Sequence, residues 1–253
     1  MYILACDTTA KTASVCVAKA SEESLVPYSH ATVNKTLTHS ESLLPMIDFC
    51  LKNACISFND INIAAVSAGP GSFTGVRIGV STIKGLAYGN DNVSCIGVSS
   101  LEALAHNLKR YSSTSIIVPL MDARRNQFYN AAFSFTKSGK IKRLRDDSLT
   151  DFSGITEYLK DNFSGKNIIL TGDGAELFYS LYSKSEHKNL KISLCDYAHM
   201  YEDAFSVALC AYKQYTKVTK KDIYTSEKLS PVYLRASQAE RELKQKQSGG
   251  NNK

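Results

Sequence analysis

One glycine turn in this sequence could bind an anion, and two aspartates that end apolar runs could act with a metal ion. Asp7-Thr8-Thr9 and Asp122-Ala123-Arg124 each follow an apolar run, and a third run, residues 63–66, leads into Gly69-Pro70-Gly71-Ser72. A strand, a glycine turn and a helix in succession can hold an anion, because the first amides of a helix have no partner within the helix. The same glycines also suit a tight turn without a ligand. The pattern is neither a Walker A loop nor a GxGxxG fingerprint, so both interpretations stay open.

The elements that would position these residues occur twice in the same order. Each half reads strand, strand, strand, helix, strand, with an aspartate after its first strand and a glycine turn after its last. This order resembles the actin, Hsp70 and sugar-kinase superfamily and predicts an α/β, actin-like (ASKHA, ribonuclease H-like) duplicated two-lobe fold. The expected strands lie at 2–6, 14–18, 28–33 and 63–66 in the first half and at 115–121, 127–135, 141–144 and 167–171 in the second, with helices at 40–52 and 155–162.

The expected domain organisation follows from this repeat. We expect an N-terminal lobe at 1–110 that carries partner-binding helices and a second lobe at 111–235 that includes a return helix near 201–217. The charged tail, 236–253, is expected to be disordered.

Composition indicates an ordinary globular protein of the cytoplasm. The chain has 253 residues, of which 43% are hydrophobic, and a formal net charge of +6, which by itself is weak support for RNA binding. No apolar run approaches the roughly 20 residues of a membrane span, and the chain begins with a strand-like segment rather than a basic leader. The seven cysteines are scattered without metal-ligand spacing, so we expect them to be small core residues.

Ordinary ATP binding is disfavoured by two missing glycines. In ATP-using members of the superfamily each first-strand aspartate belongs to an Asp-x-Gly hairpin that wraps a phosphate. Here Asp7 is followed by two threonines, and Asp122 by Ala123 and two arginines. Side chains at these positions keep the hairpin amides away from a phosphate. We therefore expect no cofactor and interpret the set as a vestigial phosphate loop: Asp7, Thr8, Thr9, Gly69, Gly71 and Ser72.

The helix expected at 74–88, capped by Thr74, has a face of small residues that includes Gly75 and Gly79. A glycine inside a helix costs about 1 kcal/mol relative to alanine, so these residues indicate close packing. The neighbour is either another helix of the same domain or a helix of a partner protein. The helix at 40–52 carries an apolar arc wider than one core contact requires, which suggests that one side faces outward.

His39, Ser40 and Asp7 have the residue types of a catalytic triad, but their arrangement does not support one. No Gly-x-Ser-x-Gly elbow is present. Thr38 and Glu41 instead fit the capping box of a helix, so no catalytic residue is assigned.

Motifs in the same order along nearly the whole chain resemble the TsaB (YeaZ) family. They are Asp7-Thr-Thr9, His39-Ser40 with Leu43-Leu44-Pro45, Gly69 to Gly75 with Arg77-Ile-Gly79, Lys84-Gly-Leu-Ala87, Asp122-Ala-Arg124 and Pro231-Val-Tyr-Leu-Arg235. The resemblance implies a subunit without activity of its own that docks two helices against the paralogue TsaD. The residues it places in that interface are His39, Leu43, Leu44, Ile47, Gly75, Val76, Gly79, Val80, Ile83 and Leu86.

TsaD itself is the nearest alternative, and its metal site uses a His-x-x-x-His pair. Ser100 and Leu104 stand at those two positions, and neither can replace an imidazole as a metal ligand. We expect no metal there, a capping box at Ser99 and Glu102, and His106 on a helix surface.

The resemblance implies a scaffold required to form the threonylcarbamoyl group on adenosine 37 of tRNAs that read codons beginning with adenine. The implied partners are a TsaD-like transferase and a TsaE-like ATPase, with only indirect or weak contact to tRNA and none to a membrane. A homodimer through the same helices is a further expectation when the partner is missing. The alternative from another class is a nucleotide-dependent hydrolase or small-molecule kinase that uses Asp7 and Asp122 with a metal.

Overall fold

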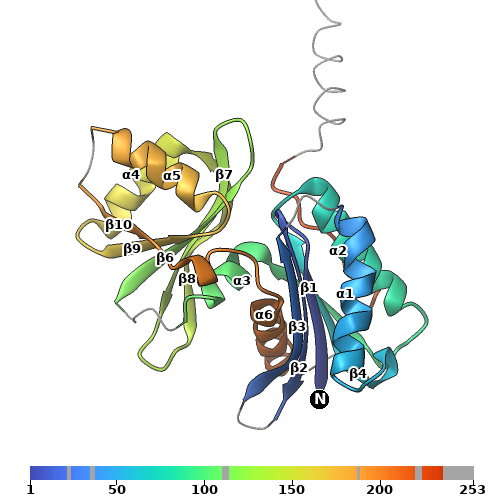
Figure 1. Ribbon diagram of the computed structural model, residues 1–253. Helices are drawn as coiled ribbons and strands as arrows, with labels where there is room; N and C mark the ends of the chain where they lie inside the picture. The colour runs from blue at the N-terminus through green and yellow to red at the C-terminus, as the bar shows by residue number, and fades with distance from the viewer. Residues whose placement is uncertain (22–23, 35–37, 110–113, 187–188, 220–223, 236–253) are drawn as a thin grey trace, which may run out of the picture.

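The computed structural model describes residues 1–21, 24–34, 38–109, 114–186, 189–219 and 224–235. The chain forms two lobes, each built on one five-stranded mixed sheet (Figure 1). Within these described ranges no helix is both long and apolar enough to cross a bilayer. The tail at 236–253, expected to be disordered, lies outside the described residues.

The first sheet has the order β3-β2-β1-β4-β5. The antiparallel strands come first in the chain, and β4 and β5 run parallel to β1. The strands are β1 (Tyr2–Asp7), β2 (Thr12–Ala20), β3 (Leu25–Asn34), β4 (Ile61–Gly69) and β5 (Ser94–Ser99).

Helices cover both faces of this sheet. Alternate side chains of β1 point to opposite faces, so Leu4 and Cys6 enter one core while Ile3 and Ala5 enter another. Figure 1 shows α1 (His39–Asn53) and α2 (Phe73–Leu86) on the outer face, and α6 (Ala204–Lys217) on the face toward the second lobe. Burial on both faces explains why β1 and β4 are continuous apolar runs rather than alternating ones.

The second sheet repeats this plan with the order β10-β9-β6-β7-β8, so the predicted duplication and the actin-like two-lobe fold are confirmed. The two sheets match strand for strand in chain order, with β6 in the place of β1. The remaining elements are β6 (Ser115–Asp122), β7 (Gln127–Phe135), β8 (Ile141–Asp151), β9 (Asn167–Thr171), β10 (Lys191–Leu194), α3 (Ser100–His106), α4 (Phe152–Phe163), α5 (Ala175–Lys184), and the short 3-10 helices η1 (Phe58–Asp60) and η2 (Tyr197–His199).

Several boundaries differ from the sequence-based expectation for identifiable reasons. The cap of α2 is Ser72 rather than Thr74, and its hydroxyl accepts a hydrogen bond from the Gly75 amide at 3.3 Å. The return helix begins at Ala204 because Asp203 caps it. That helix was expected with the second lobe, but α6 packs on the first sheet. Cys55 was expected in the core, but it is exposed; the other six cysteines are buried.

Candidate cleft and outer helix face

A cavity of about 500 Å³ lies where the two lobes meet. It is bordered by the β1–β2 turn, the start of α2, the β6–β7 turn with Tyr129 of β7, the turn between β9 and α5, and residues 233–235. Its lining residues include Thr9, Lys11, Ser72, Asp122, Asp173 and Arg235.

Of the expected vestigial phosphate loop, Thr9, Gly71 and Ser72 line this cavity, while Asp7 and Thr8 are buried behind it. Asp7 is fully buried, and its Oδ1 accepts hydrogen bonds from the Thr9 amide at 2.8 Å and the Thr9 hydroxyl at 2.7 Å. The Ser67 hydroxyl donates to its Oδ2. Burial raises the pKa of the Asp7 carboxyl, while these hydrogen bonds oppose the rise.

The amides at the start of α2 are partly used within the chain. The Ser72 amide donates to the Thr9 carbonyl at 2.7 Å, and a Cβ added at Gly71 would lie 2.6 Å from that carbonyl oxygen. The β1–β2 turn therefore occupies space and donors that an anion at this helix terminus would need.

Gly75 and Gly79 face the same turn rather than a partner. A Cβ added at Gly75 would lie 1.9 Å from the Thr8 carbonyl oxygen, and one at Gly79 would lie 2.8 Å from the Thr8 hydroxyl. The hydroxyl of Thr8 also donates to the Gly75 carbonyl at 2.7 Å. The small residues are thus explained by close packing within the lobe.

Most residues expected at the partner interface lie inside the first lobe, which corrects the expectation that they are available on its surface. Leu43, Ile47, Val76, Val80 and Ile83 belong to the core under α1 and α2, and Gly75 and Gly79 are buried. Leu86 is half-buried, and His39 is held by a 2.7 Å hydrogen bond between its Nε2 and the Ala10 carbonyl. Of the ten, Leu44 is the one that is largely exposed, at 53%.

The outer face of the two helices carries other residues. Phe49 of α1 is 53% exposed, and Tyr88, just after α2, is 83% exposed. Arg77, Ser81 and Gly85 are exposed on α2. A Cβ added at Gly85 would meet nothing within 4 Å, so packing in the described chain does not require a glycine there.

The second lobe repeats the aspartate turn without glycine. The Arg124 amide donates to Asp122 Oδ1 at 2.7 Å, just as the Thr9 amide donates to Asp7. Arg124, Arg125 and Asn126 have φ values of 62°, 58° and 58°, in the left-handed region that disfavours side chains. The turn keeps this backbone shape at a conformational cost and places the Arg124 side chain at the cavity.

Two carboxyl groups at or beside the cleft, the partly buried Asp173 and the buried Glu202, were not predicted as site residues. The Asp122 amide donates to Asp173 Oδ1 at 3.0 Å. Glu202 is 3% exposed, and neither of its carboxyl oxygens has a hydrogen-bond partner within the described residues. Burial, together with the nearby Asp173 and Asp7, raises the pKa of Glu202 well above its usual range.

Residues 231–235 contact both lobes beside the cleft, which gives the Pro231-to-Arg235 motif a structural role. The Val232 amide donates to the Ala68 carbonyl at 2.7 Å. Tyr233 lies against Phe73 with ring centroids 4.6 Å apart. Arg235 donates to the Ala123 carbonyl of the second lobe at 2.5 Å and to the Gln127 side chain.

The helix α3 has Ser100 and Leu104 buried at the positions where TsaD would have histidines. Ser99 caps it by accepting from the Glu102 amide at 3.2 Å, as expected, whereas the Glu102 carboxylate pairs with Arg143 at 2.8 Å. His106 was expected on the surface, and this is wrong: it is 3% exposed. Burial, with Lys213 and Lys109 nearby, lowers its pKa to about 3.

The duplicated sheets and the shared aspartate turns define the class: a two-lobed actin-like α/β protein. A family model described as "TsaD: tRNA N6-adenosine threonylcarbamoyltransferase" matches residues 34–247. The chain belongs to the TsaB (YeaZ) family within that wider group.

Individual TsaB proteins are similar in sequence to this chain over most of its length. The tRNA threonylcarbamoyladenosine biosynthesis protein TsaB of Haemophilus influenzae is 28% identical over 242 residues, which cover 93% of this chain and 94% of that protein. TsaB of Bacillus subtilis is 34% identical over 161 residues, which cover 64% of this chain and 67% of that protein. The solved structure of YeaZ from Pseudomonas aeruginosa superimposes with a TM-score of 0.72 at 20% identity, over 92% of this chain and 99% of that one, which supports the fold.

Proposed function

We propose that this chain is a scaffold subunit in the formation of the threonylcarbamoyl group on adenosine 37 of tRNAs that read codons beginning with adenine. It has no catalytic role of its own in this proposal. Its partners are a TsaD-like transferase and a TsaE-like ATPase, and its contact with tRNA is indirect or weak. The names of the TsaB relatives support the pathway.

The observation that carries the scaffold role is the contrast between the cleft and the outer helix face. Asp7, Thr9 and Ser67 at the cleft bond to one another, whereas Leu44 and Phe49 of α1 are about half exposed. Gly85 adds a position where a partner backbone can approach closely, since no neighbour in the described chain fills that space. We therefore move the proposed docking surface outward from the buried glycines to Leu44, Phe49, Ser81, Gly85 and Tyr88.

Gly85→Gln tests this surface without disturbing the core. A glutamine is a better helix former than glycine, so the isolated chain should remain folded and be up to about 1 kcal/mol more stable. Its side chain should nevertheless block the paralogue. Size-exclusion chromatography with light scattering, on the chain mixed with its TsaD-like paralogue, should show a complex for the native chain and loss of that complex for the variant.

Two controls make this result specific. Ser180→Gln adds the same side chain at an exposed position of α5 and should leave the complex intact. Gly79→Leu is unsuitable, because its side chain would collide with Thr8 inside the lobe. A complex that survives Gly85→Gln at native affinity would refute this surface, and a homodimer of the chain alone that Gly85→Gln disrupts would show the same face pairing two copies.

The cavity supports a second candidate, a nucleotide-dependent hydrolase or small-molecule kinase. Lys11, Arg124 and Arg235 border it and could neutralise a phosphate. Calorimetry of the isolated chain with ATP and magnesium separates the two functions. Micromolar binding would favour the enzyme, and its absence together with complex formation would favour the scaffold.

A further inference from the structure

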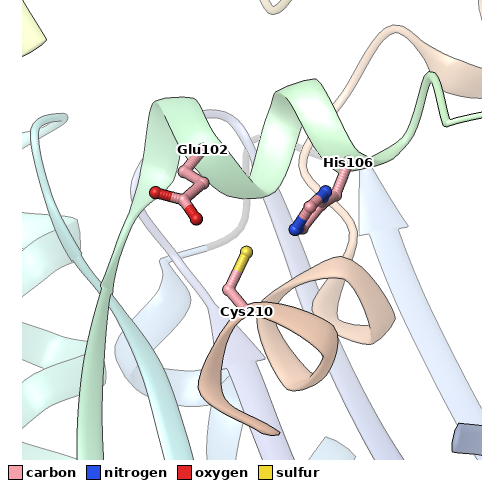
Figure 2. Close-up of side chains that lie close together, drawn as sticks. All are labelled: Glu102, His106 and Cys210. Atoms are coloured by element: carbon pink, nitrogen blue, oxygen red, sulfur yellow. The ribbon is translucent and has the colours of Figure 1, made fainter. Parts of the chain in front are cut away.

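Three potential metal ligands meet where α3 crosses α6. Glu102 and His106 are one turn apart on α3, and Cys210 lies opposite them on α6 (Figure 2). One ligand atom from each residue lies within 4.8 Å of the other two. Residues four apart share one face of a helix, so the spacing of Glu102 and His106 aims both at the same partner helix.

The surroundings fit a closed site rather than an exposed cluster. His106 and Cys210 are buried, with exposures of 3% and 1%, and Glu102 is partly buried. The Nδ1 atom of His106 is buried and has no hydrogen-bond partner among the described residues. An unsatisfied buried ring nitrogen is costly, and a metal ion is one way to satisfy it.

The carboxylate is already held by a supporting group. Arg143 donates to Glu102 Oε2 at 2.8 Å and also pairs with Asp147. Such a bond fixes the orientation of a ligand and leaves the other carboxylate oxygen for an ion.

We propose that Glu102, His106 and Cys210 bind one Zn²⁺ ion at the junction of α3 and α6. Nitrogen, sulfur and oxygen ligands together favour zinc, and a water would supply the fourth position of a tetrahedron. Binding would form a Zn–S bond as the Cys210 S–H bond breaks, with its proton released to solvent. The resulting thiolate and the Glu102 carboxylate balance the two positive charges of the ion.

Lys213 is the main opposing group. Its ammonium lies 3.4 Å from His106 Nε2, where it would repel a dication. Lys213 and His106 both line a cavity of about 680 Å³, which gives the ion a route to the site and the ammonium room to move away. Zinc binding should therefore tighten when Lys213 is replaced by methionine, which keeps the length of the side chain without its charge.

An ion at the junction of α3 and α6 would lie between the cores of the two lobes. Leu101 and Leu104 of α3 belong to the core of the second lobe, whereas Ala208 and Ala211 of α6 belong to a core of the first. An ion bound by both helices would therefore tie the two lobes together at their junction.

Cobalt substitution tests the site on the full chain. Chelator-treated protein carrying Cys55→Ser, which removes the exposed thiol, is titrated with Co²⁺, and Zn²⁺ affinity is measured by competition with a chromophoric chelator. We expect one Co²⁺ per chain, a thiolate-to-cobalt charge-transfer band, and a rise in melting temperature with Zn²⁺. Cys210→Ala should abolish the band, whereas Cys195→Ala, at a buried cysteine of the second lobe, should retain it.

Two results of the cobalt titration would contradict the proposed zinc site. Absence of a thiolate band in the parent protein, or an equal band in Cys210→Ala, would overturn the proposal. Melting curves confirm that each variant folds. If Cys210→Ala does not fold, Glu102→Gln carries the test, because it keeps the size of the side chain and should still weaken Co²⁺ binding at least about 10-fold; unchanged binding would refute the assigned ligands.

Discussion

At the scale of single residues, the first lobe contains backbone contacts too close to admit a side chain. The approach of the Thr8 carbonyl to α2 leaves no room for a Cβ at Gly75, whereas Gly85 on the same helix faces open space. The two glycines therefore serve different purposes, although a helical sequence pattern treats them alike.

This difference predicts opposite effects of one substitution. Gly75→Ala should lower the free energy of unfolding by about 1–3 kcal/mol, because the added methyl group must displace backbone. Gly85→Ala should raise it by up to about 1 kcal/mol, through helix propensity alone. Urea denaturation of both variants checks the pair, and equal effects would contradict the assignment of Gly75 to close packing.

Glu202 gives a second residue-scale prediction, on pH. A carboxyl whose pKa is raised in the fold keeps its proton after the unfolded chain has lost it, so the stability it contributes falls as the pH rises above its ordinary value of 4.5. Glu202→Gln cannot ionise and should gain stability relative to the native protein as the pH increases from 4.5 toward neutrality. Denaturation curves across this range test the sign, with Glu157→Gln at an exposed position of α4 as the control.

At the scale of elements, residues 231–235 behave as a strap anchored by α2. The Arg77 guanidinium lies 3.8 Å from the centroid of Phe73, and its Nε donates to the Tyr233 hydroxyl at 2.9 Å. The strap then reaches β4, where Gly69, at φ 116°, leaves space for the Val232 carbonyl.

Arg77→Ala should loosen this strap. An exposed cation–π contact contributes about 0.5–1 kcal/mol, so the Val232 amide should exchange with deuterium roughly two- to five-fold faster. Lys52→Ala breaks an exposed ion pair with Asp48 on α1 and should leave that amide unchanged. Unaltered exchange in Arg77→Ala would show that the strap is held by its backbone contacts alone.

The sequence allowed the elements to be predicted better than the contacts between them. The repeated strand order and the paired Asp7 and Asp122 turns follow from local patterns, and both are found in the structure. The burial of His106 and of Glu202 depends on how α3, α6 and the second sheet meet. No periodicity within a short segment contains that information, because residues distant in the chain create these environments.

At the scale of the whole molecule, the two lobes are joined at the cleft by Arg235, which comes from the strap and binds the β6–β7 turn. Removing this side chain should let the lobes separate. We expect Arg235→Ala to increase the radius of gyration measured by small-angle X-ray scattering. Arg124→Ala, which removes an exposed partner of Asp122, should leave it unchanged. The same radius in both variants would assign the lobe spacing to other contacts.

The packing of α6 on the first sheet also sets the order in which this protein can be completed during its synthesis. One face of that sheet stays uncovered until residues 204–217 leave the ribosome, and β4 receives the Val232 contact only after a further stretch of chain. The segments of the first lobe are thus synthesised first and last, and the segments of the second lobe are synthesised between them. Contacts this distant in sequence slow folding, so a nascent chain exposes apolar β1, β2 and β4 surface throughout most of its translation.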